Sequence, residues 1–133
     1  KYDIIIDLDA TSPLRKISDI KHALKKMILN KSPNLFTVCV SRRNPYFNAV
    51  EFRNKKIQPV KNLMKKITSR QAAPVVYDMN ASIYIWTRNL LLKSNTVFHK
   101  KTSIYKMPEE RSIDIDTRFD SQIVEYLLKN DEK

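Results

Sequence analysis

The sequence predicts an α/β fold built around a strand, helix, strand unit. Residues 2–8 and 35–40 are continuous apolar runs, the pattern of parallel strands that are buried on both faces of a sheet. Between them, apolar residues from Ile20 to Ile28 recur at helical spacing. A helix that connects two such strands forms a βαβ unit, and its crossover is expected to be right-handed.

Polar residues mark the boundaries of this first helix. Ser18 is expected to be its N-cap, and Asp19 in the first turn is favourably placed against the helix dipole. Asn-Lys-Ser-Pro at residues 30–33 ends the helix. After the second strand, residues 47–52 and 57–60 flank Arg-Asn-Lys-Lys, a pattern typical of an antiparallel hairpin.

The C-terminal half of the chain predicts further strands and a last helix. Thr117 is expected to cap that helix together with Asp120, in a capping-box arrangement. The helix has an expected buried face of Ile123, Val124, Leu127 and Leu128. The elements before it are a strand, a short helix, an extended segment and a final strand at residues 82–86, 88–92, 102–106 and 112–116.

The net charge of +11 is concentrated in one segment. Between Ser41 and Arg70 the chain has nine basic residues and a single acid, Glu51, so this segment carries a charge of +8. Such a segment binds nucleic acid, an anionic membrane, a nucleotide or an acidic small molecule, or it is a solvated lysine-rich surface. The nine basic residues are Arg42, Arg43, Arg53, Lys55, Lys56, Lys61, Lys65, Lys66 and Arg70.

Three features of the composition restrict the possible functions. Glycine is absent, which excludes a P-loop and a GxGxxG motif. No apolar stretch approaches the ~18 residues of a transmembrane helix, so no membrane span is expected. The single cysteine, Cys39, forms no internal disulfide and is expected to be a buried, reduced core residue, which fits a cytoplasmic protein.

The run Ser-Ile-Asp-Ile-Asp-Thr at residues 112–117 contains a candidate metal site. In a strand, Asp114 and Asp116 would share one face with Cα atoms about 7 Å apart. A hard divalent cation such as Mg²⁺ would relieve the repulsion between the two carboxylates, and it prefers oxygen ligands. The alternative is a charged edge that faces solvent or pairs with Lys or Arg, and the pattern alone does not choose between the two.

Polar residues at two other places are candidates for ligand binding. The loop after the first strand offers the hydroxyl groups of Thr11 and Ser12 and the cation of Arg15, at the carboxyl end of a strand, where ligands bind in open α/β sheets. The alternative is an ordinary turn fixed by a proline. Farther along, Asn80 and Ser82 begin a strand and share a face with Tyr84. The alternative there is hydrogen bonding at the strand edge. Arg70, in the basic segment, is a further candidate or an ordinary solvated arginine.

Four short motifs occur in order along the chain. They are Thr-Ser-Pro-Leu-Arg at residues 11–15, Arg-Gln-x-x-Pro at 70–74, Asn-x-Ser-Ile-Tyr at 80–84 and Ser-Ile-Asp-Ile-Asp-Thr at 112–117. Together they resemble the motifs of the CMP-sialic acid synthetases, the acylneuraminate cytidylyltransferases. The resemblance covers only the C-terminal part of that family, because the A-R-x-G-S-K and K-N motifs of its N-terminal CTP-binding region have no counterpart here.

The resemblance implies a fold and an activity. The expected fold is a Rossmann-like nucleotidyltransferase (GT-A-like) sheet with an inserted β-hairpin arm and with its N-terminal part missing. Residues 1–133 would be the C-terminal part of a cytidylyltransferase domain, with residues 44–79 as a basic excursion that forms a homodimer. The family transfers CMP from CTP to a nine-carbon acidic sugar and releases pyrophosphate, and it uses Mg²⁺.

The resemblance also implies roles for the candidate residues. Asp114 and Asp116 would hold Mg²⁺, and Asp116 would help to activate the sugar hydroxyl. Arg70 would approach the sugar carboxylate in the cleft of the partner subunit. The residues that would line the substrate cleft are Asp9, Thr11, Ser12, Arg15, Asn80, Ser82, Tyr84 and Phe98, with Tyr84 and Phe98 in the sugar pocket.

Two positions distinguish this chain from the usual sialate members of the family. Asp9 stands where those members have glutamine, and with residues 42–48 and 77–80 it is similar to the branch that activates analogues such as legionaminic acid. Ala81 stands where a glycine is usual. Two alternatives are an inactive remnant that acts only in dimerisation and, less favoured, a basic nucleic-acid-binding module, since the sequence has no aromatic-rich binding strand or recognition helix.

Overall fold

The computed structural model describes residues 2–63 and 67–131, so Lys65 and Lys66 of the basic segment lie outside the described residues. The chain divides into two compact units. The first consists of Lys1–Cys39 and Met79–Lys133, and the second of Val40–Asp78. Among the described residues, no helix is both long enough and apolar enough to cross a bilayer.

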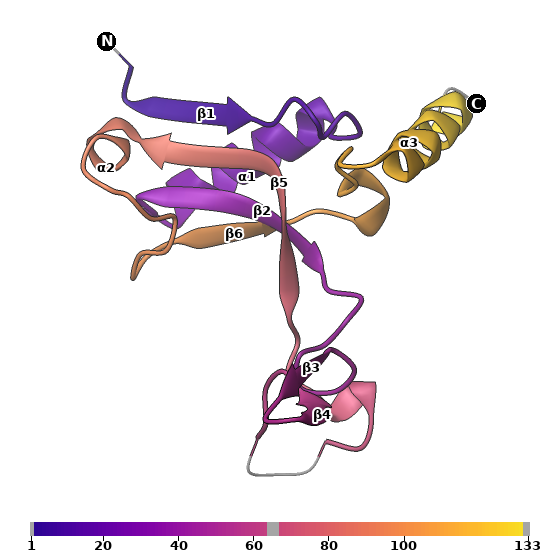
Figure 1. The fold of residues 1–133 in the computed structure, drawn as a ribbon. Helices are drawn as coiled ribbons and strands as arrows, with labels where there is room; N and C mark the ends of the chain where they lie inside the picture. The colour runs from indigo at the N-terminus through magenta and orange to yellow at the C-terminus, as the bar shows by residue number, and fades with distance from the viewer. Residues whose placement is uncertain (1, 64–66, 132–133) are drawn as a thin grey trace. The chain divides into compact units, whose positions relative to one another are not determined.

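The first unit is built on a mixed four-stranded sheet with the order β1-β5-β2-β6. β1 (Ile4–Leu8) is antiparallel to β5 (Tyr77–Thr87), and β2 (Asn34–Val40) is parallel to β6 (Ser103–Lys106). Figure 1 shows that β1 and β2 run in the same direction and that β5 runs between them in the opposite one. The predicted α/β class is therefore confirmed, but the two strands of the expected βαβ unit are not neighbours.

The first strand is less buried than its sequence predicts. β1 lies at the edge of the sheet, and its Ile6 and Leu8 side chains are 37% and 40% exposed. The expectation of a strand buried on both faces is therefore wrong in this structure. A continuous apolar run specifies burial only if layers and neighbours are present on both sides, and among the described residues β1 pairs only with β5.

The core of the first unit lies between α1 (Ile17–Leu29) and the sheet. Ala23 and Met27 of the helix are buried against Ile83 and Ile85 of β5. Each fully buried Ile, Leu or Met side chain contributes about 2 kcal/mol of hydrophobic stabilisation. The cluster also contains Leu35 and Met107.

The start of α1 differs from the expected one. The N-cap is Lys16 rather than Ser18. Asp19 decides this, because its Oδ2 accepts the backbone N–H of Lys16 at 2.9 Å and its own N–H donates to the Lys16 carbonyl at 2.9 Å. The Asp19 carboxylate, at the third helical position, thus satisfies the backbone N–H of Lys16. If Ser18 were the N-cap, this N–H would lie outside the helix.

The remaining helices are short, apart from the last one. They are η1 (Arg70–Ala72), α2 (Arg88–Leu91), η2 (Glu109–Arg111) and α3 (Arg118–Asp131). The capping box of α3 is confirmed: the Thr117 N–H donates to Asp120 Oδ2 at 2.8 Å, and the Asp120 N–H donates to Thr117 Oγ1 at 3.3 Å. On its expected buried face, Val124 is buried but Leu128 is 46% exposed.

Residues 112–116 do not form the predicted final strand. Ser112 follows η2 as its C-cap, and the residues after it have no regular secondary structure. The alternating Ser-Ile-Asp-Ile-Asp pattern is that of a strand, but a strand needs a neighbour with which to share a ladder of hydrogen bonds. Here the Ile115 N–H donates to the Thr11 carbonyl at 2.9 Å, and no ladder forms.

The second unit contains an antiparallel hairpin of β3 (Val50–Arg53) and β4 (Lys56–Pro59). Asn54 and Lys55 between them both have positive φ angles, of 52° and 61°, as the turns that suit hairpin twist require. Among its basic residues, Arg53 forms an ion pair with Glu51 at 2.7 Å, and the Lys61 ammonium lies over the Tyr46 ring. Cys39, at the end of the first unit's opening segment, is half-buried rather than fully buried.

Candidate functional site

The loop after β1 is attached directly to β5. The Asp9 N–H donates to the Ser82 carbonyl at 3.3 Å. Arg15 Nη1 donates to the carbonyls of both Ser12, at 2.9 Å, and Ser82, at 3.3 Å. The Arg15 cation predicted as a ligand contact thus joins the loop to the strand beside it.

The segment that carries the two aspartates lies against the same loop and the same strand. The Ile115 N–H donates to the Thr11 carbonyl, and Asn80 Nδ2 donates to Ser112 Oγ at 2.9 Å. Three of the four sequence motifs are therefore brought together by direct hydrogen bonds, although they are up to about a hundred residues apart. The fourth motif lies in the second unit, where Arg70 Nη2 donates to the Ser41 carbonyl at 3.1 Å. The Arg70 side chain lines a small pocket together with Asn44.

Asp9 shapes the loop through its side chain. Its Oδ1 accepts hydrogen bonds from the backbone N–H and the hydroxyl of Thr11, at 2.8 and 2.7 Å. These bonds hold the pKa of the Asp9 carboxyl below its ordinary value, because they stabilise the charged form. Asp9 is therefore an ionised acceptor at neutral pH, and it uses one oxygen to keep Thr11 in place.

Three aromatic side chains from separate segments of the chain pack together. Phe36 of β2 lies between Tyr84, whose ring centroid is 6.4 Å away, and Phe98, which it meets edge to face at 5.8 Å. Burial raises the pKa of the Tyr84 hydroxyl, and the negative charges of Asp9 and Asp7 raise it further. Tyr84 is thus a protonated hydrogen-bond donor at neutral pH, while Phe98 is 66% exposed and presents its ring to solvent.

Asn80 is the centre of a buried polar network. Its Oδ1 accepts the Thr37 hydroxyl at 2.6 Å, and its Nδ2 is bonded to Ser112, with Met107 Sδ at 3.5 Å. The Thr37 hydroxyl also accepts the Ile83 N–H at 3.0 Å. Asn80 therefore positions three segments, and only 4% of it is exposed.

Two buried hydroxyl groups in the site have unmet hydrogen-bonding capacity. Ser12 and Ser82 are 1% and 0% exposed, and the Oγ atom of each is buried without a hydrogen-bond partner. An unsatisfied buried hydroxyl costs free energy, so such atoms are rare except where a water or a ligand completes them. Both belong to the motifs that meet here.

Asp114 and Asp116 lie on the loop beside Thr11. Asp114 is half-buried and Asp116 is exposed. Within residues 2–63 and 67–131, no group of three or more His, Cys, Asp or Glu side chains could hold a metal ion. Two carboxylates fit a hard cation such as Mg²⁺ that takes its other oxygens from water and from phosphate groups of a substrate.

Comparison with known proteins gives relatives along almost the whole chain. The chain is 47% identical over 127 residues to the CMP-N,N'-diacetyllegionaminic acid synthase of Campylobacter jejuni, a match that covers 96% of this chain and 53% of that protein. It is 44% identical to post-translational flagellin modification protein B of Campylobacter coli, over 97% of this chain and 54% of that protein. These similarities support the CMP-sialic acid synthetase family for this chain. No family model matches it.

The legionaminic branch, which Asp9 together with residues 42–48 and 77–80 predicts, is supported by the Campylobacter jejuni relative. Identity falls to 30% over 114 residues with the N-acylneuraminate cytidylyltransferase of Streptococcus agalactiae serotype III, which is matched over 27% of its length. It is 27% with the pseudaminic acid cytidylyltransferase of Campylobacter jejuni. The chain spans about half the length of the Campylobacter relatives named above.

Several residues of the site were not found by sequence reasoning. Thr37 and Phe36 lie inside an apolar strand, where a hydroxyl and a ring are ordinary residues and carry no signal. Arg111 stands directly before the acidic motif of the family and pairs with Asp19, 92 residues earlier in the chain. Its position next to that motif was the one available signal.

Ala81 has an unusual backbone conformation between the two buried residues Asn80 and Ser82. Its φ angle is 53°, in the left-handed region that glycine enters without penalty, and glycine is the usual family residue there. We expect Ala81→Gly to raise the free energy of unfolding by about 1 kcal/mol, as measured by urea denaturation. Ala23→Gly is the matched control, since it makes the same change inside α1 and should lower stability by about 1 kcal/mol. Equal destabilisation by both variants would contradict the strain at Ala81.

Proposed function

We propose that this chain forms the sugar-binding and metal-binding part of a CMP-nonulosonate synthetase. The whole protein would transfer CMP from CTP to a nine-carbon acidic sugar and release pyrophosphate. The observation that carries the proposal is the meeting of the Thr11, Asn80 and Asp114–Asp116 motifs, which direct hydrogen bonds join at the end of β1. The name of the Campylobacter jejuni relative, a CMP-N,N'-diacetyllegionaminic acid synthase, supports the same reaction class.

The proposed reaction is an in-line displacement. The anomeric hydroxyl of the sugar attacks the α-phosphorus of CTP, a new P–O bond forms, and the bond to the β-phosphate breaks as pyrophosphate leaves. Asp114 and Asp116 would hold Mg²⁺, which neutralises phosphate charge when it is bound. Asp116, the exposed member of the pair, would accept the proton of the attacking hydroxyl.

Uncharged donors would orient the acidic sugar. The protonated Tyr84 hydroxyl is a donor that an oxygen atom of a substrate would satisfy. The hydroxyls of Ser12 and Ser82 would act in the same way after a local rearrangement, because both are buried without a partner in this structure. Phe98 would pack on the apolar part of the sugar or on its acetamido groups. N,N'-diacetyllegionaminic acid is the proposed substrate, because the chain is more similar to the Campylobacter jejuni relative named for it than to the Campylobacter jejuni relative named for pseudaminic acid.

Pyrophosphate release tests this function. The chain is assayed alone and together with the part of the Campylobacter jejuni relative that it does not match, with CTP, N,N'-diacetyllegionaminic acid and Mg²⁺. Turnover that needs the added part supports the proposal and assigns CTP binding to that part. No turnover in either sample, with the relative's intact enzyme active alongside, would favour an inactive remnant. Binding of DNA or RNA that weakens as the salt concentration rises would favour the alternative of a basic nucleic-acid-binding module.

The hairpin of the second unit supports a proposal of homodimerisation. One of its faces carries the register pairs Phe52 with Ile57 and Val50 with Pro59. Phe52 and Ile57 are 73% and 72% exposed, and Val50 is 60% exposed. A two-stranded hairpin by itself is at best marginally stable in water. An exposed apolar face of this kind suits burial against a second copy of the chain.

A charge on this apolar face is therefore expected to weaken association. We expect Phe52→Lys to raise the dimer dissociation constant at least about 10-fold, since it removes roughly 1.4 kcal/mol or more of apolar burial. Sedimentation velocity over a concentration series measures it. Gln58→Lys places the same charge on the opposite face and is expected to leave association unchanged. Equal dissociation by both variants would place the interface elsewhere.

A further inference from the structure

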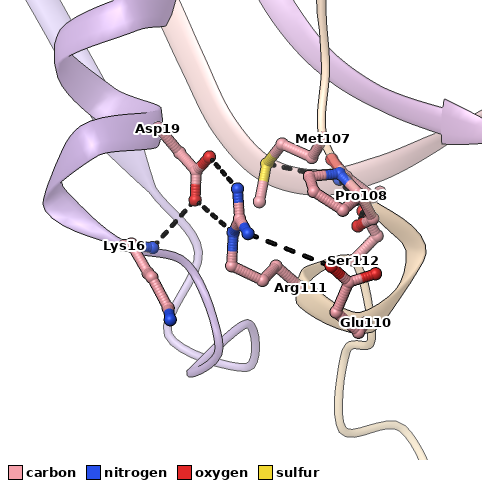
Figure 2. A network of polar contacts seen from close by, with 8 residues as sticks. Lys16, Asp19, Met107, Pro108, Glu110, Arg111 and Ser112 are labelled. Atoms are coloured by element: carbon pink, nitrogen blue, oxygen red, sulfur yellow. Dashed lines mark hydrogen bonds and ion pairs between the residues drawn. The ribbon is translucent and has the colours of Figure 1, made fainter. Parts of the chain in front are cut away.

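A bidentate ion pair links the start of α1 to the end of η2. Arg111 Nε donates to Asp19 Oδ2 and Arg111 Nη2 to Asp19 Oδ1, both at 2.9 Å. The Asp19 side chain is 1% exposed, and the Arg111 side chain is 23% exposed. Figure 2 shows the guanidinium facing the carboxylate, with the Lys16 amide on one side and Glu110 on the other.

Stability alone does not explain this pair. A buried carboxylate loses its hydration, and replacement of a buried ion pair by apolar residues of similar size is often neutral or stabilising. What the pair adds is geometry, because two parallel hydrogen bonds fix both the distance and the orientation of the guanidinium relative to the carboxylate. Asp19 is itself fixed in the first turn of α1 by the Lys16 amide.

The segment that follows Arg111 depends on such fixed points. Residues 112–115 have no regular secondary structure, so no ladder of backbone hydrogen bonds sets their course. Ser112 Oγ donates to the Pro108 carbonyl at 2.7 Å and accepts from Asn80, and the Ile115 amide bonds to Thr11. Arg111 is the point from which this segment departs, and it is the only one of these anchors formed by a charged pair.

We propose that Asp19 and Arg111 are positioning residues for the acidic loop. The ion pair fixes the start of residues 112–117, and thereby holds Asp114 and Asp116 against the Thr11 loop at the spacing that a divalent cation and a nucleotide require. The part of the inference that concerns the cation rests on the proposed function, whereas the part that concerns the course of the loop does not.

Hydrogen exchange followed by mass spectrometry tests the positioning. In the double variant Asp19→Leu/Arg111→Met the buried pair becomes apolar, so the unit is expected to stay folded, with unchanged exchange in residues 20–29. Exchange in residues 112–117 is expected to become about 10-fold faster. Glu125→Leu/Lys129→Met removes an exposed ion pair from α3 and serves as the matched control, with no expected change in that segment. Unchanged exchange in residues 112–117 of the folded double variant would overturn the proposal.

A second variant keeps the proposal testable if the double variant does not fold. Arg111→Lys keeps the charge but cannot donate two parallel hydrogen bonds to Asp19 as the forked guanidinium does. It is expected to accelerate exchange in residues 112–117 several-fold. Exchange equal to that of the unaltered chain would contradict the role of the fork.

Cation binding separates this inference from the proposed function. Mn²⁺ is titrated by electron paramagnetic resonance in the presence of CTP, with the protein completed by the unmatched part of its relative. The unaltered protein is expected to bind Mn²⁺. Arg111→Lys is expected to weaken Mn²⁺ binding about 10-fold, whereas the control variant Glu125→Leu/Lys129→Met is expected to leave it unchanged. If the unaltered protein does not bind Mn²⁺, the proposed function fails, and the exchange experiment still decides whether the ion pair positions the loop. Equal Mn²⁺ affinity in the Arg111→Lys variant would overturn the proposal.

Discussion

Replacement of Asp116 by asparagine is expected to lower the rate of the proposed CMP transfer at least about 100-fold, because it removes one of the two carboxylates proposed to hold Mg²⁺ and the proposed acceptor of the hydroxyl proton. The side chain is exposed, so the free energy of unfolding should change by less than about 0.5 kcal/mol. The change in rate is measured from initial rates of pyrophosphate release over a range of Mg²⁺ concentrations, with the chain supplemented by the unmatched part of its Campylobacter jejuni relative.

The control for this experiment is a carboxylate outside the site. Glu125→Gln neutralises an exposed acid on α3, where Glu125 pairs with Lys129, and its rate is expected to stay within about twofold of the unaltered one. If Asp116→Asn retained the full rate while Asp114→Asn did not, the metal-binding role would belong to Asp114 with other partners. Full rates in both variants would contradict the assignment of the acidic pair.

The single variant Arg111→Met is expected to lower the free energy of unfolding by about 3 kcal/mol at neutral pH, because it leaves Asp19 buried and charged without its partner. The loss should depend on pH. In the unaltered chain, burial raises the pKa of Asp19, but hydrogen bonds from Arg111 and the Lys16 amide outweigh burial and leave the pKa below its ordinary value. The stability from this ionised carboxylate is present above about pH 4, the ordinary range of the group, and is lost as the pH falls through the lowered pKa.

In the variant, burial acts without the guanidinium, so the pKa of Asp19 is expected to rise. Protonation then relieves the destabilisation as the pH falls, and the difference between the two proteins should shrink between pH 7 and about pH 3.5. Urea denaturation at several pH values measures this difference. Asp120, whose pKa the Thr117 hydrogen bonds lower, is present in both proteins and cancels in the comparison. A difference that stays constant over this range would show that Asp19 is not the group responsible.

Much of the local structure was predictable from the sequence. The apolar run of β2, the turn of the β3–β4 hairpin and the Thr117 cap of α3 are all specified by residues within a few positions of one another. Patterns of this length contain the physical cause of the structure, since a cap or a tight turn is completed by its own neighbours. The motifs of the candidate site were also found, because their residue types and order are those of the family.

Contacts between distant residues decided the rest. Ser-Ile-Asp-Ile-Asp has the alternation of a strand, yet residues 112–116 have no ladder to join, and their course is set by Asn80, Thr11 and the pair of Arg111 with Asp19. By itself, the sequence determined most of the local elements and supplied the candidate side chains for the site. Only the tertiary structure decided which elements find neighbours, because a hydrogen bond or an ion pair between residues far apart in the chain leaves no periodic signal in it.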